Sequence, residues 1–237
     1  MGFLKILLSY IGDRNFADDK SIICGIATLN GKSITVIGEQ KGKNAKENIQ
    51  RNFGMPNPEG YRKALRFMKQ AQKFNRPIVT FIDTPGAYPG IGAEERGQGE
   101  AIARNIMKMS KLNVPLICIV IGEGSSGGAL AIAIGDKIVM MENAIYSILS
   151  PEGFATILYK DSTRAKEAAE NMKLTANDLK GLNIIDDIIK EPKEGIQNNF
   201  SKVIKDLKKY LTTNINELEN MKKEELIENR YNKFRNM

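Results

Sequence analysis

The sequence predicts an α/β domain in which most strands run parallel. Short runs rich in isoleucine and valine, bounded by glycine, proline or aspartate, alternate with helical patterns, and no repeat of fixed period is present. The chain has 237 residues, of which 42% are hydrophobic and 27% charged. This is enough for one domain with a core and a small appendage. The predicted strands cover residues 33–38, 78–83, 116–122, 138–141 and 145–149.

Helical periodicity lies between these strands. Over residues 59–74, and again over 94–112, apolar side chains recur at steps of three and four, as one face of a helix requires. A third, short helix is predicted over residues 127–134. Ser150 followed by Pro151 predicts a further helix start, because serine is a common N-cap and proline fits the first helical position.

The last part of the chain predicts a helical extension. Residues 192–195 are typical of a linker, so we expect one domain over residues 1–195 and an extension over 196–237. Apolar residues of the extension could line one side of an amphipathic helix that packs on a partner or on the body of the protein. They are Val203, Leu207, Leu211, Leu218 and Leu226.

Composition excludes several mechanisms and locations. The chain contains no histidine, so it cannot by itself supply a Ser-His-Asp or Cys-His mechanism or a histidine-ligated zinc. Cys24 and Cys118 lie in apolar runs, which predicts neither a disulfide nor a metal site in this chain. The longest internal apolar run, residues 114–121, is too short to span a membrane, and residues 1–13 lack the features of a secretory leader. We expect a cytoplasmic protein without membrane association.

Positive charge is concentrated in one stretch of the chain. Residues 41–76 contain ten Lys or Arg and two Glu, a balance of +8, whereas the formal net charge of the whole chain is +7. Such a stretch suits nucleic acid, a phosphorylated cofactor or an acidic protein, or it is only the solvated face of a helix. Aromatic residues, 7% of the chain, are not interleaved with these charges, which argues against nucleic acid.

Two glycine-rich loops, residues 83–92 and 122–130, directly follow the two most apolar strands. Parallel α/β proteins place their binding sites at such strand ends. The second loop opens a helix whose first N–H groups face the loop, an arrangement that favours negative charge. The sequence therefore predicts a cluster of backbone amides that stabilises an oxyanion without a titrating side chain.

The second loop also matches motifs of other sites in part. Gly122, Gly124 and Gly127 fit the G-x-G-x-x-G pattern of dinucleotide sites, but the helix that follows is too short for such a unit. A phosphate-binding P-loop would need Lys and Ser or Thr after its last glycine, where this chain has Gly128 and Ala129. We therefore reject a dinucleotide site and a P-loop.

Two serines in the same loop raise a further possibility. Ser125 or Ser126 could act as a nucleophile if a lysine served as its base, and Lys137 is the nearest lysine in sequence. Turn formation is the simpler explanation for both serines. A serine-lysine hydrolase and a non-catalytic binder of polyanions stay open as alternatives to the oxyanion site.

Several blocks of the sequence together resemble the alpha subunits of bacterial acetyl-coenzyme A carboxylase carboxyltransferase. The similarity covers roughly residues 10–192 and extends weakly to Asn229-Arg230-Tyr231. Matching blocks of this length are highly specific. They cover residues 12–20, 40–42, 51–64, 81–90, 92–98, 122–130 and 146–155.

The resemblance implies a crotonase-like (ClpP/crotonase) fold of repeated ββα units, followed by the helical tail. It implies an active site shared with a beta subunit, in an assembly of two alpha and two beta subunits, that makes malonyl-coenzyme A for fatty-acid biosynthesis. The alpha subunit would receive carboxybiotin on the biotin carboxyl carrier protein, where a separate biotin carboxylase forms it with ATP. The beta subunit would bind acetyl-coenzyme A and carry a zinc ion.

The resemblance also assigns roles to residues of the glycine-rich loops. The backbone amides of Gly127, Gly128 and Ala129 would form the oxyanion hole for the ureido oxygen of biotin. Residues that would shape the cleft are Gly86, Ala87, Gly124 and Gly153.

Three basic residues and two departures from the family pattern complete the expectations. Arg62, Lys63 and Arg66 could contact the phosphates of coenzyme A at the shared cleft. Ser125 stands where the family usually has glycine, which would be strained if the position required a positive φ. Glu39 stands where the family often has histidine.

Overall fold

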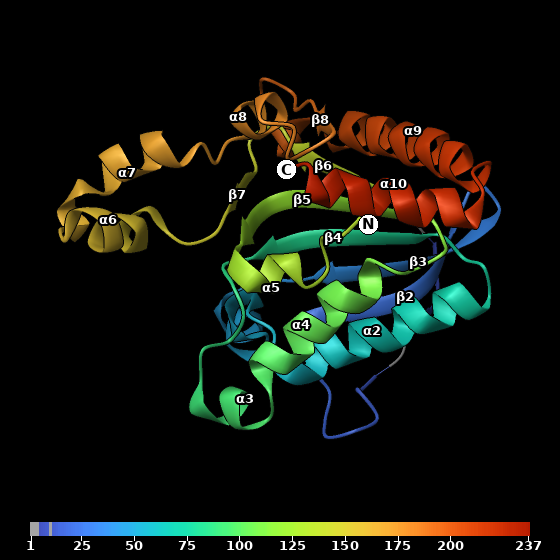
Figure 1. Cartoon of the computed structure of the whole chain (residues 1–237), viewed down its shortest axis with the longest axis horizontal. Coiled ribbons are helices and arrows are strands. Elements are labelled where there is room, and N and C mark those ends of the chain that lie inside the picture. Colours follow the sequence, from blue (N-terminus) through green and yellow to red (C-terminus); the bar gives the residue numbers. More distant parts are fainter. Residues whose placement is uncertain (1–4, 10) are drawn as a thin grey trace.

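The computed structural model describes residues 11–237 in full and residues 5–9 as backbone (Figure 1). Within these residues the strands form one eight-stranded sheet in the order β1-β2-β3-β4-β5-β6-β8, and β7 pairs with the end of β5. Strands β1 to β3 are antiparallel, and every pairing from β3 onwards is parallel. The strands are β1 (Lys5–Ser9), β2 (Ile22–Leu29), β3 (Lys32–Glu39), β4 (Ile78–Thr84), β5 (Leu116–Ser125), β6 (Lys137–Met141), β7 (Ile145–Ser147) and β8 (Asp187–Ile189).

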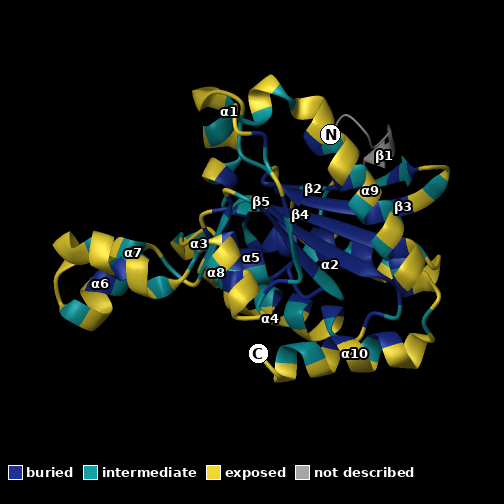
Figure 2. Ribbon diagram, turned by 90° about the horizontal axis from the view of Figure 1, so that it is seen from above, coloured by how far each residue is buried: buried dark blue, intermediate teal, exposed yellow. Residues whose placement is uncertain are grey.

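Helices cover the sheet, whose central strands are buried (Figure 2). In β4 and β5 the side chains on both faces are buried, which explains why these strands appear in the sequence as nearly continuous apolar runs. The helices are α1 (Ala45–Gln50), α2 (Pro58–Lys73), α3 (Ile91–Glu95), α4 (Gln98–Met109), α5 (Ser126–Leu130), α6 (Pro151–Tyr159), α7 (Ala165–Met172), α8 (Ala176–Gly181), α9 (Phe200–Glu219) and α10 (Lys223–Arg235). The α/β class with mostly parallel strands is confirmed.

Three differences between the predicted and the observed elements have a clear physical reason. The helix expected over residues 94–112 is two helices, α3 and α4, because Gly97 between them has a φ of 83°. The helix expected over 127–134 ends at Leu130. Strand β2 was missed, although the Asn30-Gly31 turn that follows it, with φ values of 48° and 83°, is typical of a tight hairpin.

The C-terminal extension packs on the body of the protein. The apolar residues expected on one side of its helix are buried, and they belong to the same core as the central strands. Arg230 of α10 is buried and forms a two-pronged ion pair with Asp136, at 2.8 and 2.9 Å. Its guanidinium also donates to the carbonyl oxygens of Met109, Leu112 and Val114. The division into domains at residue 195 stays a prediction.

Candidate active site

The two glycine-rich loops meet at the carboxyl ends of β4 and β5. These strands are neighbours in the sheet, and Thr84 is in register with Gly124. A Cβ atom on Gly128 would lie 2.5 Å from the backbone nitrogen of Ala87 and from the carbonyl carbon of Gly86. Only glycine allows this approach, so the contact between the loops depends on Gly128. The structure therefore brings together Gly86, Ala87, Gly124 and Gly128.

The first loop contains a backbone conformation that favours glycine. Gly86 has a φ of 143°, which residues with a side chain rarely adopt. The Thr84 hydroxyl donates to the Gly86 carbonyl oxygen at 2.8 Å and accepts the Gly86 N–H at 3.0 Å. Thr84 was not among the residues expected at the site, although Thr-Pro-Gly is a typical turn sequence.

The second loop leads into α5 without backbone strain at Ser125. Ser125 is extended, with a φ of −117°, so serine in place of glycine costs nothing there. The positive φ, 58°, belongs to the exposed Ser126. The Ser125 side chain makes no capping hydrogen bond, and the first N–H groups of a helix have no acceptor within it. The amides at the start of α5 are thus available to an anion.

The three residues expected to form the oxyanion hole differ in burial. Gly127 is half-buried, whereas Gly128 and Ala129 are buried. A Cβ on Gly127 would make only an ordinary contact, 3.6 Å from Ile102. Gly124 lies under the Tyr146 ring, where a Cβ would be 2.9 Å from the ring. Gly127 therefore lies on the more accessible side of the turn, and Gly124 and Gly128 are required by packing.

Gly153 lies apart from these residues. It belongs to a projecting segment, residues 148–173, that we call the arm and that contains α6 and α7 (Figure 1). The N–H of Gly153 donates to the Ser150 hydroxyl at 3.1 Å, as the predicted N-cap requires. The arm joins the body through a narrow neck, where Ile145 pairs with Thr175. The structure of this chain does not bring Gly153 to Gly86 and Gly128.

An ion-pair cluster stands at the same strand ends. The Lys41 ammonium lies 3.0 Å from a carboxylate oxygen of Asp83 and 2.9 Å from one of Glu123. Burial lowers the pKa of Lys41, but Glu123 and Asp83 together raise it above its usual value. Lys41 therefore stays protonated at neutral pH and cannot serve as a general base. No spacing in the sequence indicates this cluster, because Asp83 and Glu123 lie in different strands and Lys41 follows a third.

The other lysine considered as a base is also ruled out. Lys137 pairs with Ile117 near the amino end of β5, whereas Ser125 ends that strand. An extended strand rises about 3.3 Å per residue, which puts Lys137 about 25 Å from the serines. Lys137 therefore cannot activate Ser125 or Ser126.

A cavity of about 630 Å³ lies on the opposite face of the sheet from α5. Phe81 and Ile121 line it together with α9, and Lys41 and Asp83 stand at its polar end. Thr80, next to Phe81 in β4, points to the other face, where its hydroxyl donates to the Ile132 carbonyl oxygen after α5. Because neighbouring side chains of a strand alternate between faces, this cavity is separate from the contact between the two loops at Gly128, and of the loop residues only Asp83 lines it.

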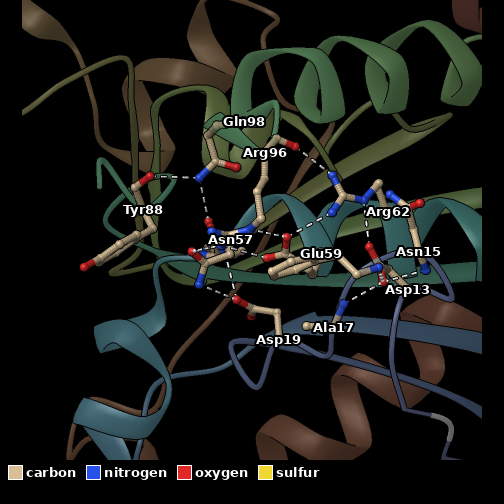
Figure 3. A network of polar contacts seen from close by, with 12 residues as sticks. Asp13, Asn15, Ala17, Asp19, Asn57, Glu59, Arg62, Tyr88, Arg96 and Gln98 are labelled. Carbon is tan, nitrogen blue, oxygen red and sulfur yellow. Dashed lines mark hydrogen bonds and ion pairs between the residues drawn. The ribbon is translucent and has the colours of Figure 1, made fainter. Parts of the chain in front are cut away.

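The three basic residues expected at coenzyme A phosphates are engaged within the chain. Arg62 pairs with Asp13 at 2.7 Å and with Glu59 at 2.9 Å (Figure 3). Lys63 is buried and pairs with an oxygen of Asp18 at 2.6 Å. These contacts anchor the loop of residues 12–19 on α2.

Arg66 completes this anchoring, and Asp13 organises the loop. Arg66 donates to the Gly12 carbonyl oxygen at 2.9 Å. One oxygen of Asp13 accepts the N–H groups of Asn15, Phe16 and Ala17. Burial raises the pKa of Asp13, but these N–H groups and Arg62 outweigh it and hold that pKa below its usual value. A role at coenzyme A stays a prediction for the three basic residues.

Glu39 has a buried carboxyl group with a raised pKa. Neither of its carboxyl oxygens has a hydrogen-bond partner among the residues that the structure describes. Burial, and then the Asp83 carboxylate, raise its pKa well above the usual value, against the lowering effects of Lys41 and the Asp83 backbone amide. Burial and the nearby Asp83 carboxylate therefore favour the neutral form of Glu39.

Comparisons with known proteins agree with this geometry. Among solved structures, transcarboxylase 12S with methylmalonyl-coenzyme A and methylmalonic acid bound matches with a TM-score of 0.65 at 22% identity, over 81% of this chain and 37% of that one. A Pseudomonas malonate decarboxylase hetero-tetramer in complex with coenzyme A matches with a TM-score of 0.74 at 13% identity, over 90% of this chain and 85% of that one. The fold is that of the crotonase-like carboxyltransferases, as expected.

Sequence comparisons identify the family. Residues 3–237 match the model of the acetyl co-enzyme A carboxylase carboxyltransferase-like family. The alpha subunit of acetyl-coenzyme A carboxylase carboxyl transferase from Clostridium perfringens (strain 13 / Type A) is 62% identical over 226 residues, 95% of this chain and 83% of that protein. The same subunit from Clostridium acetobutylicum is 60% identical over 228 residues, 96% of this chain and 83% of that protein. The chain belongs to this family of carboxyltransferase alpha subunits.

Membership defines the general setting of the site. The chain is a carboxyltransferase subunit of a biotin-dependent system that uses acetyl-coenzyme A, and it works with other subunits of that carboxylase. Within the described part of the chain, no three His, Cys, Asp or Glu side chains are grouped as a metal site would require. No helix among the same residues has the length and apolar character to cross a membrane.

Proposed function

We propose that this chain and a beta subunit together transfer a carboxyl group from carboxybiotin, held on the biotin carboxyl carrier protein, to acetyl-coenzyme A. The product is malonyl-coenzyme A for fatty-acid biosynthesis. A biotin carboxylase supplies the carboxybiotin with ATP, and the beta subunit carries the zinc ion and binds acetyl-coenzyme A. The carboxyltransferase is an assembly of two alpha and two beta subunits that is active only when both are present.

The contribution of this chain is electrostatic. When bound, carboxybiotin supplies the carboxyl group, and its ureido nitrogen takes the methyl proton of acetyl-coenzyme A as the new carbon–carbon bond forms. The backbone N–H groups of Gly127, Gly128 and Ala129 stabilise the negative charge that the ureido oxygen acquires. Preorganised amides of this kind need no reorganisation during the reaction. A protein base is not required, which fits a chain without histidine.

One observation carries this proposal: Gly128 lets the two loops approach to backbone contact at the carboxyl ends of β4 and β5. The start of α5 thereby lies against the backbone of the first loop at Gly86 and Ala87. The expected arm contribution, through Gly153, fits the same scheme if the arm of this chain lies against the beta subunit.

Gly128→Ala tests the proposal in the complex with the beta subunit. The methyl group would lie 2.5 Å from the Ala87 nitrogen and push the loops apart. Loss of one oxyanion-hole donor lowers kcat by about 100- to 1,000-fold, and we expect a loss of that size in malonyl-coenzyme A decarboxylation with free biotin. Gly99→Ala is the matched control, because a Cβ on Gly99 meets nothing within 4 Å. Equal activity of the two variants would refute the oxyanion role of this turn.

A further inference from the structure

We propose that Gln98 is a positioning residue of the carboxyltransferase reaction, which holds the first glycine-rich loop at the separation from α5 that the oxyanion hole needs. This inference rests on the function proposed above. Gln98 is the first residue of α4 and contacts no reacting atom. Its hydrogen bonds, its burial and the attachments of the loop carry the argument.

The Gln98 side chain ties together two separate segments. Its amide nitrogen donates to the carbonyl oxygens of Pro56 and Tyr88, each at 2.9 Å (Figure 3). The N–H of Tyr88 donates to the same Pro56 oxygen at 3.0 Å. Gln98 is only 3% exposed, so its side chain is shielded from water. The segment before α2 and the first loop are therefore joined both by the Tyr88 N–H and through the buried Gln98 side chain.

This tie lies next to the contact between the two loops. Tyr88 directly follows Ala87, whose backbone nitrogen faces Gly128. The Thr84 hydroxyl holds the loop at Gly86, and two hydrogen bonds hold it at Tyr88, one from the Gln98 amide and one from the Tyr88 N–H to Pro56. Without Gln98, only the Tyr88 N–H would tie this part of the loop to Pro56, and the segment next to α5 would be held less firmly.

The position of Gln98 is itself fixed by an ion-pair network. Arg96, two residues before it, pairs with the buried Glu59 of α2 at 2.7 Å. Arg62 pairs with the same carboxylate and donates to the Arg96 carbonyl oxygen at 3.0 Å (Figure 3). Gly97 then turns the chain into α4 with a φ of 83°. The start of α4 is thus held against α2, and the hydrogen bond from Gln98 to Tyr88 fixes the loop relative to the start of α4.

Gln98→Met in the full chain, purified with the beta subunit, tests this role. Methionine has a similar length but no donor, so the Tyr88 carbonyl oxygen loses its partner. We expect kcat for malonyl-coenzyme A decarboxylation with free biotin to fall about 10- to 100-fold, as small misplacements of a catalytic group do. KM for malonyl-coenzyme A should stay unchanged, because the change affects the amides that face the ureido oxygen.

Asn105→Leu is the matched control. Asn105 is also a buried amide of α4 that donates to a backbone carbonyl of α2, that of Tyr61 at 3.1 Å, but it does not reach the loop. Both variants should lower the melting temperature, and only Gln98→Met should lower kcat. Equal kcat in the two variants would overturn the positioning role.

Two further measurements keep the test decisive. If Gln98→Met does not fold, Gln98→Asn replaces it, since the shorter amide cannot reach both carbonyl groups and the same fall in kcat is expected. Gly128→Ala separates the inference from the proposed function. If Gly128→Ala leaves kcat unchanged, the proposed function fails. If Gly128→Ala lowers kcat and the Gln98 variants do not, only the positioning role fails.

Discussion

The body of the protein and its arm differ in how far their apolar side chains are buried. In the body, the strands that carry the glycine-rich loops are buried on both faces, and the loops are held by hydrogen bonds within the chain. In the arm, the buried side chains of α6 and α7 are Ala155 and Ala168, whereas Ile148, Ile157 and Leu158 are exposed (Figure 2). The body holds its loops with contacts within its own chain, whereas the arm leaves apolar side chains exposed.

Arg230→Met should lower the free energy of unfolding of the body by the largest amount. It leaves the Asp136 carboxylate buried without the Arg230 guanidinium, and it removes one donor from the carbonyl oxygens of three residues. Removing one partner of a buried ion pair costs about 3–5 kcal/mol. We expect a loss of that size in the free energy of unfolding, measured by urea denaturation.

Arg235→Met in the same helix is the control for this prediction. Arg235 is exposed and contacts only the Tyr231 hydroxyl among the interactions described for it. Surface changes of this kind stay within about 0.5 kcal/mol. A loss of similar size in both variants would show that α10 contributes through general packing instead of the Arg230 contacts.

Limited trypsin digestion compares the arm directly with the body. Lys160, Arg164 and Lys173 lie at helix ends of the arm and are exposed. We expect the first cuts of the isolated chain there, because short helices with few buried side chains open easily. Binding of the beta subunit should slow these cuts about tenfold or more. Equal cleavage rates with and without the beta subunit would contradict the arm's role in the interface.

The fold could be predicted from the sequence wherever a segment carries its own pattern. The parallel strands other than β8, which was not predicted, and α2 are apolar runs or amphipathic repeats, and their positions agree with the prediction to within a few residues. The break between α3 and α4 depends on the left-handed backbone of Gly97. The periodicity of apolar residues continues across this glycine and does not indicate the break. The arm could not be predicted as a projection, because its sequence is an ordinary series of helical patterns.

The candidate site, like the fold, was predicted from the sequence only in part. Both glycine-rich loops were predicted to lie at the ends of apolar strands where α/β proteins place their sites, and the structure brings them into contact at Gly128. The basic residues of α2 were expected to face a ligand, but Arg62 and Lys63 pair with Asp13 and Asp18, which lie more than forty residues earlier in the chain. Such pairing depends on tertiary structure, and charge counting along the sequence cannot detect it.

Glu39→Gln tests how tightly the body is closed. In the unfolded chain a glutamate loses its proton near pH 4.3, whereas burial keeps Glu39 protonated in the folded protein to a much higher pH. The folded state therefore binds one more proton, and the wild type loses stability as pH rises above about 4.3. Glutamine cannot ionise, so the variant avoids this loss.

The stability advantage of Glu39→Gln over the wild type should therefore be small near pH 4.5 and grow steadily towards pH 8 in urea titrations. Glu59→Gln is the matched control: the same substitution at a buried carboxylate that pairs with Arg62 and Arg96 should destabilise the protein. If Glu39→Gln instead destabilises the protein as Glu59→Gln does, then Glu39 is ionised and paired in solution. The body would then be open to water at the carboxyl end of β3, and it would differ less from the arm than its packing indicates.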